Sequence, residues 1–379
     1  MYKKFVMGIA AMAALTLVSC SSDDLDSFSD NSSKNEAISF DGYLGRSAVA
    51  VNGTRGSVLD VTALQNSTEG FGVFGHYKEA VGLEFDHDLF NNQQVTYKKS
   101  ATASAWTYSP LKFWPAQGHI DFLAYAPYDS KYNDKVSKDN QKIDFTVNST
   151  IKDQKDLLWA NNAVNQTMAN NSKNKVKFQF KHALSRLGYS VKLYGDYTSN
   201  NVKFTLKEIT LTGSDPKSTT ASTTETAKAF YTDGTIDLST GNWEKHTAAA
   251  GKQDFINWFS GTQDVTSATE SEPFKNSESD YLFVIPQNFS AKIGGADNPD
   301  KLYVIVKYTI TYTDGGAPEI TNTVYKQITP NFLQGKAYKL NLTLGLPIEF
   351  DVAVDGVEGW GEDEKINIGS NDENPWDRK

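Results

Sequence analysis

The chain has 379 residues, a formal net charge of -9 and 12% aromatic residues. This length is enough for two or three domains with sizeable hydrophobic cores. The acidic balance argues against nucleic acid as a partner, because its phosphates need a basic footprint on the protein.

Residues 1–19 have the features of a lipoprotein signal peptide. Lys3 and Lys4 supply a basic start, and the apolar run that follows is shorter than the ~20 residues that span a bilayer. The run ends in Leu17-Val18-Ser19-Cys20, which resembles the bacterial lipobox, in which the cysteine is diacylated and becomes the first residue of the mature chain. We therefore predict lipidation at Cys20. A plain secretory signal with a chance cysteine is the alternative.

Cys20 is the only cysteine of the chain. If it carries lipid, the mature protein has no free thiol, which excludes disulfides, Cys-ligated zinc and cysteine catalysis. We expect residues 20–36 to form a disordered acidic tether. They are rich in Ser, Asn and Asp and have too little apolar surface to order themselves.

Residues 37–44 predict a first strand, and two of the chain's four arginines follow it. Arg55 lies between glycines, in the small-residue context where proteases most often cut loops. Arg46 lies nearer the strand. Arg186 has apolar neighbours and is expected to be protected in the fold, and Arg378 is at the far end. An arginine-specific protease would therefore find few targets.

Short apolar segments separated by polar loops predict an all-β chain. The candidate strands of the first half are residues 71–77, 106–108, 111–114, 120–125, 143–147 and 175–180. Ala183, Leu184 and Leu187 fit one short helical turn. At this turn we place the junction between two β domains, residues 37–182 and 183–379.

One strand of the second half changes face along its length. Val202, Phe204 and Leu206 share one parity, whereas Ile209 and Leu211 follow in the opposite one. An extra residue at positions 207–208 produces such a shift, so the pattern predicts a β-bulge.

The remaining strands of the second half alternate regularly. Residues 304–312 and 324–328 predict a hairpin with a longer loop. Residues 338–344 alternate in the same way, and residues 350–354 follow them.

No pattern in the sequence predicts an enzyme or a cofactor site. Phosphate-loop, zinc-protease and nucleophile-elbow motifs are all missing. Residues 86–88 place at most two ligands on one face, and residues 295–300 fit a turn better than a calcium loop. His182 has no second ligand at a suitable spacing, so we expect a packed, hydrogen-bonded side chain. Trp243 and Trp258 could stack on sugars, but a core role is the default.

The order and spacing of several loose motifs point to one family. They are the lipobox, the arginine segment at 46–55, Phe71–Phe74, the block from Phe113-Trp114-Pro115 to Ala126-Pro127, residues 180–185 and residues 335–345. Together they resemble the fimbrillin family, the lipoprotein-precursor pilins of Bacteroidales, over nearly the whole mature chain.

This resemblance implies a fold and a mode of assembly. Family members fold as two tandem β-sandwich domains with transthyretin-like topology and reach the outer membrane as lipoproteins. An arginine-specific protease then releases the first strand, and a neighbouring subunit inserts a strand into the groove. On this chain residues 37–55 would be the removable segment, with Ile38 and Phe40 in its strand. Arg55 is the first choice for the cut and Arg46 the second.

The donor strand has two candidates. Ile348, Phe350, Val352 and Val354 have the better alternation, whereas Ile366 and Ile368 lie in a tail that could more easily swing out. The partners would be other fimbrial subunits, the protease and the outer membrane.

The role of the subunit has alternatives. A stalk or tip subunit of a fimbrium that serves surface adhesion would lose the lipid with the first strand, whereas an anchor subunit would keep both. A surface lipoprotein that binds glycans for nutrient capture would also keep residues 20–55. That protein should show exposed Trp or Tyr clustered on one face.

Overall fold

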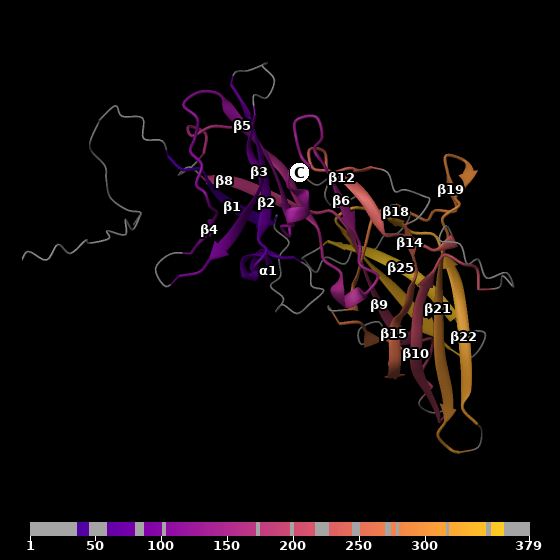
Figure 1. The fold of residues 1–379 in the computed structure, drawn as a ribbon. Coiled ribbons are helices and arrows are strands. Elements are labelled where there is room, and N and C mark those ends of the chain that lie inside the picture. The colour runs from indigo at the N-terminus through magenta and orange to yellow at the C-terminus, as the bar shows by residue number, and fades with distance from the viewer. Residues whose placement is uncertain are drawn as a thin grey trace, which may run out of the picture. The chain divides into compact units, whose positions relative to one another are not determined.

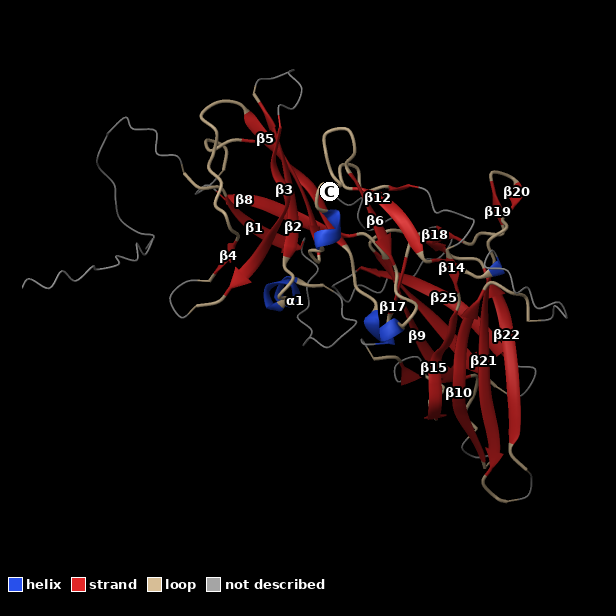
Figure 2. Ribbon diagram, in the orientation of Figure 1, coloured by secondary structure: helices blue, strands red, loops and turns tan. Residues whose placement is uncertain are grey.

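The computed structural model describes twelve stretches of the chain. They are residues 36–44, 59–79, 87–100, 104–171, 175–197, 201–216, 227–244, 251–269, 274–277, 280–315, 318–345 and 350–359. Strands dominate these stretches, as predicted (Figure 2). The helical segments are short: α1 (Val61–Asn66), η1 (Ser130–Tyr132) and η2 (Ile151–Asp153). No helix in the described stretches has the length and apolar character to cross a bilayer.

The first half of the chain builds one large sheet, called sheet A. Its strands, in spatial order, are β1 (Ser39–Leu44), β8 (Lys175–His182), β7 (Leu158–Gln166), β5 (His119–Ala126), β2 (Phe71–Lys78), β3 (His87–Lys98) and β4 (Ala105–Thr107). The neighbours pair antiparallel, except that β1 lies parallel to β8. β1 is therefore an edge strand joined to the sheet by a pairing of a different kind.

Sheet A is apolar on both faces. Phe71, Phe122 and Phe178 belong to one aromatic core. Phe74 and Tyr125, from the opposite face of the same strands, belong to another. Successive strand residues point to opposite faces, which explains why β2 and β5 are buried nearly throughout instead of alternating between buried and exposed.

Two further sheets come from the second half. Sheet B has the order β15 (Phe255–Val265), β10 (Val202–Thr212), β21 (Leu302–Tyr312) and β22 (Ile320–Ile328). Sheet C has the order β16 (Phe274–Lys275), β9 (Ser185–Leu193), β24 (Lys336–Leu344) and β25 (Phe350–Gly359), and β17 (Leu282–Val284) also pairs with β9.

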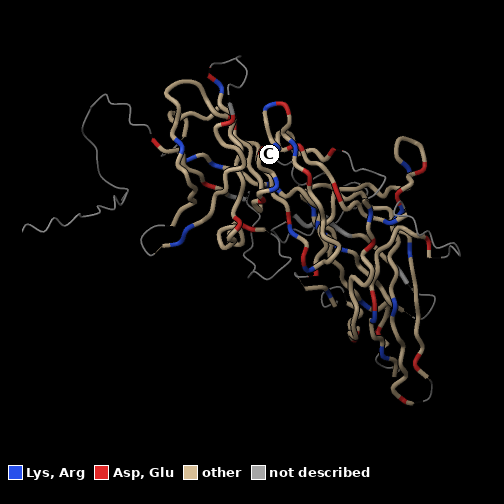
Figure 3. Tube along the Cα trace, in the orientation of Figure 1, with Lys and Arg blue, Asp and Glu red and all other residues tan. Residues whose placement is uncertain are grey.

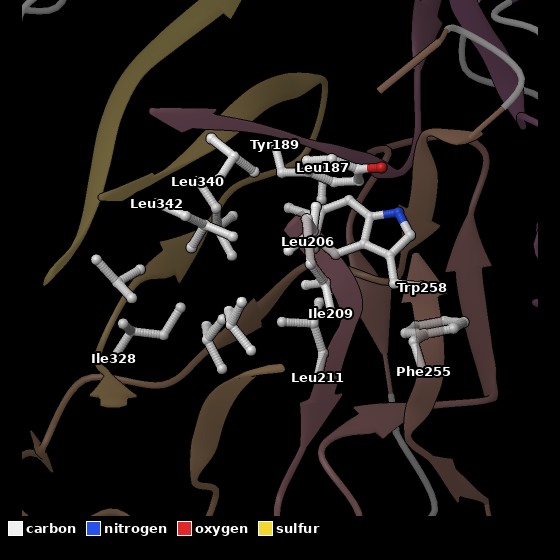
Figure 4. Packing of buried hydrophobic residues seen from close by; sticks show 14 of the residues in the cluster. Leu187, Tyr189, Leu206, Ile209, Leu211, Phe255, Trp258, Ile328, Leu340 and Leu342 are labelled. Carbon is white, nitrogen blue, oxygen red and sulfur yellow. The ribbon is translucent and has the colours of Figure 1, made fainter. Parts of the chain in front are cut away.

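Sheets B and C enclose a common core, which makes a sandwich. Figure 4 shows Leu340 and Leu342 of sheet C facing Leu206 and Ile209 of sheet B. Trp258 packs into the same core, where only 4% of its surface is exposed. This arrangement confirms the β-sandwich character that the sequence predicts for this part of the chain.

Small pairings complete the fold. They are β13 (Trp243–Glu244), β12 (Asp233–Asp237) and β6 (Lys142–Thr146) in that order, β11 (Phe230–Tyr231) with β14 (Lys252–Gln253), β18 (Gln287–Asn288) with β23 (Asn331–Phe332), and β19 (Lys292–Ile293) with β20 (Ala296–Asp297). The pairing of β6 with β12 joins the first half to the second through a shared ladder.

The predicted bulge and hairpin are present. The register of β10 shifts between Leu206 and Glu208 against both of its neighbours, so Leu206 and Ile209 both face the core. β21 and β22 pair antiparallel from Leu302 with Ile328 to Ile310 with Ile320.

Other sequence predictions were wrong or incomplete. Ala183 and Leu184 are not helical, and the chain from Ser185 is strand β9. β9 is paired along both edges and is buried on both faces. Its apolar residues therefore do not alternate with polar ones, and their spacing resembles that of a helix. Residues 111–114 form no strand beyond one isolated bridge at Phe113. The elements β3, β7, β15 and α1 were not predicted from the sequence.

Candidate functional site

The predicted first strand lies at one edge of sheet A. β1 pairs with β8 and also contacts β4, the strand at the other edge (Figure 1). In the described residues no ladder joins β1 to β4, so one ladder holds β1 in the sheet. A strand at an edge can leave without separating any other pair of strands.

Two sets of backbone contacts hold this segment. Along β8 the pairing is parallel, from Ser39 opposite Lys175 to Leu44 opposite Phe180. Before the strand, the Ile38 amide donates to the Lys112 carbonyl at 2.8 Å, and the Trp114 amide donates to the Glu36 carbonyl at 3.0 Å. The segment thus has hydrogen-bonding partners along both of its edges.

Phe40 fills an aromatic pocket beneath the strand. Its ring stacks on that of Phe178, with centroids 5.6 Å apart, and meets the edges of Phe90 and Phe122 at 5.4 and 5.7 Å. Ile38 and Phe40 are 1% and 3% exposed. Burying two such side chains stabilises the strand by about 1.5–3 kcal/mol each. Removing the strand would leave a hydrophobic groove lined by these rings.

Tyr108 forms the far wall of the pocket. Its ring centroid lies 5.3 Å from that of Phe40, and its hydroxyl donates to the Ile38 carbonyl at 2.7 Å. Burial raises the pKa of the Tyr108 phenol, and the hydrogen bond with the Lys112 backbone lowers it by less. The hydroxyl is therefore held as a neutral donor that the first strand satisfies.

The chain is anchored again just before α1. The Leu59 amide donates to the buried carboxylate of Asp156 at 3.2 Å, and Asp60 caps α1 by accepting from the Ala63 amide. Both predicted cleavage sites, Arg46 and Arg55, fall in residues 45–58, which lie outside the described residues. A cut after either arginine would therefore separate residues 36–44 from the chain that resumes at Leu59.

Comparisons with known proteins identify the family. The model of the fimbrillin-like family matches residues 54–356. The chain belongs to the fimbrillin-like family. No curated protein matches the chain.

Solved structures extend this assignment to the fold. A fimbrial protein from Bacteroides vulgatus is 21% identical, with a TM-score of 0.62 over 86% of this chain and 99% of that chain. Candidate cell adhesion proteins from Bacteroides ovatus and Bacteroides uniformis are 15% and 16% identical, with TM-scores of 0.47 and 0.42. They cover 87% and 86% of this chain and 100% and 98% of their own. At these identities the first structure shows a shared fold.

The donor-strand candidates of this fimbrillin-like chain lie partly in β25. Val352 is 4% exposed and packs in the core between sheets B and C, and Val354 packs against that core. The backbone of Phe350 pairs with Leu344. Ile348, Ile366 and Ile368 lie outside the described residues, as does Cys20.

The structure places the other candidate residues in structural roles. His182 Nδ1 lies 2.7 Å from Asp156 Oδ2, the packed arrangement that the sequence predicts. The indole NH groups of Trp243 and Trp258 donate to the carbonyls of Ala183 and Asp280, both at 2.7 Å. Neither tryptophan is among the exposed large side chains of the described residues. Trp258 therefore has the predicted core role, and Trp243 is half-buried and packs against the core that contains Phe74 and Tyr125.

The charges of the described residues give no focused ligand site. Acidic and basic residues are scattered over strands and loops (Figure 3). In the part of the chain that the structure describes, no three His, Cys, Asp or Glu side chains are grouped to hold a metal ion. Arg186 stacks over the Tyr281 ring at 4.5 Å, within a strand paired on both edges.

The sequence predicts that Ile38 and Phe40 are buried, but it does not predict Phe90 or Phe178 as the rings that contact Phe40. Phe90 lies in β3, whose alternation is broken by two register shifts against β2. The pocket comes from strands far apart in the sequence, so no local pattern predicts it.

Proposed function

We propose that this chain is a structural subunit of a fimbrium, in the stalk or at the tip, with no catalytic role. Membership of the fimbrillin-like family and the shared fold with a fimbrial protein support this proposal. The subunit serves adhesion at the cell surface. It reaches the outer membrane as a lipoprotein attached through Cys20 and assembles with other fimbrial subunits.

One observation carries the proposed assembly mechanism. The edge segment at residues 36–44 buries Ile38 and Phe40, and it is linked to the chain that resumes at Leu59 by a stretch with two arginines. Cleavage after Arg55, or after Arg46, disconnects this segment. The edge of β8 and the aromatic pocket then become available to a strand from a neighbouring subunit.

Exposing this edge late has a physical advantage. An open strand edge over a hydrophobic groove recruits any available strand, and this leads to aggregation. Keeping β1 in place until the protease acts restricts the open edge to the site of assembly. The head-to-tail contact that results does not close on itself, so it grows a filament.

The domain division is part of this proposal. The core beneath β1 draws on residues from Ile38 to Phe180, and the core of the sandwich draws on residues from Leu187 to Val352. These separate cores support two tandem domains, residues 37–182 and 183–379, with transthyretin-like topology. The third core and the pairing of β6 with β12 would form the contact between them.

The glycan-binding alternative has less support. Such a protein should present several Trp or Tyr rings on one face. Among the described residues the exposed large aromatics are Phe113 and Tyr194, and they are far apart in the sequence. A lipid-retaining anchor subunit differs from the proposed role only in keeping residues 20–55.

The N-terminus of the protein on native cells tests the proposal. The experiment is an intact-mass measurement of protein sheared from the cell surface and of protein left in the membrane. An unlipidated chain that begins at Gly56, or at Ser47, supports cleavage and strand exchange. An acylated Cys20 at the N-terminus of all surface protein contradicts it, and a sugar-binding screen would follow.

A further inference from the structure

A cavity of about 510 Å³ lies among the loops that follow β5 and β6. Its walls are drawn from residues 127–132, residues 145–148, residues 153–157 and Glu69. The volume falls in the range of about 300–1,000 Å³ that is typical of small-molecule sites. Among the described residues, none of β1 or β8 lines it. Release of the first strand would therefore leave these walls in place.

We propose that this cavity binds a neutral sugar, the terminal ring of a glycan on the surface to which the cell adheres. This inference rests on the proposed function for its use in adhesion, because a surface fibre would present the cavity to that glycan. Binding itself depends only on the cavity, so purified protein is sufficient to detect it.

Three aromatic side chains line the cavity: Tyr128, Tyr132 and Phe145. Tyr132 and Phe145 are 4% and 9% exposed, and Tyr128 is half-buried. These rings line a recess, so they are not among the exposed large side chains of the described residues. The faces of a sugar ring consist largely of C–H bonds and can pack against aromatic rings. The tyrosines also carry a polar end that a sugar can reach.

Two ion pairs supply charged groups to the same cavity. Lys155 Nζ lies 2.6 Å from Glu69 Oε1, and Lys131 Nζ lies 3.4 Å from Asp129 Oδ2. All four residues line the cavity. Each pair places a donor beside an acceptor, and a sugar hydroxyl can both donate and accept. One hydroxyl can therefore bridge each pair, which suits a ligand with several neighbouring hydroxyls.

The balance of charge disfavours ionic ligands. The carboxylates of Glu69, Asp129 and Asp153 oppose an anion such as phosphate. A cation would be attracted to the face of an aromatic ring, but Lys131 Nζ already lies over the Tyr132 ring, 4.8 Å from its centroid. Since each lysine is also paired with an acid, an added ion gains no partner without displacing another. A neutral ligand avoids this cost.

One wall of the cavity is held in place without a ligand. The Asp129 amide donates to the hydroxyl of the buried Tyr125 at 3.1 Å, and Asn92 Nδ2 donates to the Asp129 carbonyl at 2.9 Å. The Tyr128 amide donates to the Gly70 carbonyl at 3.1 Å. A wall fixed in this way loses little conformational freedom when a ligand binds, which favours binding of a small molecule.

Ligand-observed NMR on purified protein tests the ligand class. The protein is the lipid-free precursor, made with Cys20→Ser. The neutral probes are galactose, N-acetylglucosamine, mannose, fucose and lactose, and the charged probes are choline and inorganic phosphate. We expect saturation transfer from the protein to a neutral sugar and none to choline. Phosphate, observed by its phosphorus signal, should show no broadening. Binding of no sugar in the panel, or of a charged probe instead, overturns the inference.

Matched variants locate the bound sugar. Tyr128→Ala removes a ring and Lys155→Met removes a donor, and each should raise the Kd of the sugar by about tenfold. The controls are Tyr194→Ala, at a ring that is 66% exposed, and Lys152→Met, at an exposed position of η2. Neither control residue lines the cavity, so both variants should keep the wild-type Kd.

The exposed position of Lys155 keeps this test decisive even if Tyr128→Ala fails to fold. Sugar binding that Lys155→Met leaves unchanged, or that Lys152→Met weakens equally, places the sugar elsewhere and overturns the inference.

Binding and assembly can fail separately. In native cells Lys155→Met should form fibres like the wild type but should lose attachment to beads coated with the bound sugar. Fibres made of protein that binds no sugar would overturn the inference and leave the proposed function standing. Wild-type protein that binds the sugar but keeps its lipid and forms no fibre would contradict the proposed function and leave the sugar site standing.

Discussion

The ring of Phe40 stacks on the ring of Phe178 with an interplanar angle of 25°. This contact joins the first strand to β8 from within the core, beside a backbone pairing that is parallel. A side chain in the segment that we propose is removed thus completes a core that consists otherwise of strands of the remaining chain.

Truncating Phe40 should destabilise the uncleaved protein. In the lipid-free precursor, made with Cys20→Ser, we expect Phe40→Ala to lower the free energy of unfolding by about 3–5 kcal/mol, because it leaves a cavity among four rings. Urea unfolding measures the change. Phe113→Ala is the matched control, since this ring is 49% exposed, and it should stay within about 0.5 kcal/mol. Equal effects of the two would contradict the pocket.

Tyr108→Phe should change how stability depends on pH. At neutral pH the loss of the hydrogen bond to Ile38 should cost about 0.5–1.5 kcal/mol. Burial raises the pKa of Tyr108, so the unfolded chain loses this proton at a lower pH than the folded chain. Stability from this group is therefore complete below the ordinary tyrosine pKa of 10.0 and falls as the pH rises above it.

The difference between wild type and Tyr108→Phe should therefore shrink between pH ~8 and ~11. Unfolding curves at both values measure it, and the other buried tyrosines cancel because both proteins contain them. Tyr194→Phe, which removes an exposed hydroxyl, is the control for the loss of a surface phenol. A difference that is constant with pH would argue against a buried neutral phenol at the groove.

Arg55→Lys should block maturation. An arginine-specific protease does not accept lysine, so we expect surface protein of this variant to retain residues before Gly56 and to lose most of its fibres. Intact mass and electron microscopy of native cells measure both effects. Arg186→Lys is the control, because Arg186 lies in a strand paired on both edges. If Arg55→Lys matures normally and Arg46→Lys does not, the cut lies at the second site.

Asp156→Ala should weaken the contact that holds the chain just before α1. The same carboxylate oxygen, Oδ2, accepts from the Leu59 amide and lies against His182 Nδ1, so removing the carboxylate should cost about 1–3 kcal/mol. Hydrogen exchange of the Leu59 amide should accelerate at the same time. Asp153→Ala, at a nearby exposed position, should change neither quantity. An unchanged Leu59 amide would show that Asp156 does not anchor this segment.

Local sequence patterns were sufficient to predict strands that have one face against the core and the other face away from it. The parity change between Leu206 and Ile209 predicted a bulge, because one extra residue moves every later side chain to the other face. The first strand was predicted for the same reason: Ile38 and Phe40 point inward, and Ser39 and Asp41 point away from the core. Export signals and arginine positions are also properties of the chain itself, and their use in this protein stays a prediction.

Features that depend on contacts between distant strands leave no local pattern in the sequence. β9 is buried on both faces, so its apolar residues no longer alternate and the start of the strand imitated a helical turn. The pairing of β1 with β8 joins residues more than a hundred positions apart, and the pocket of Phe40 draws on Phe90, Phe122 and Phe178 from three strands. The sequence determined which side chains the first strand would bury. Only the packing of the strands of sheet A determined what they are buried against, because that depends on contacts between distant strands rather than on neighbours along the chain.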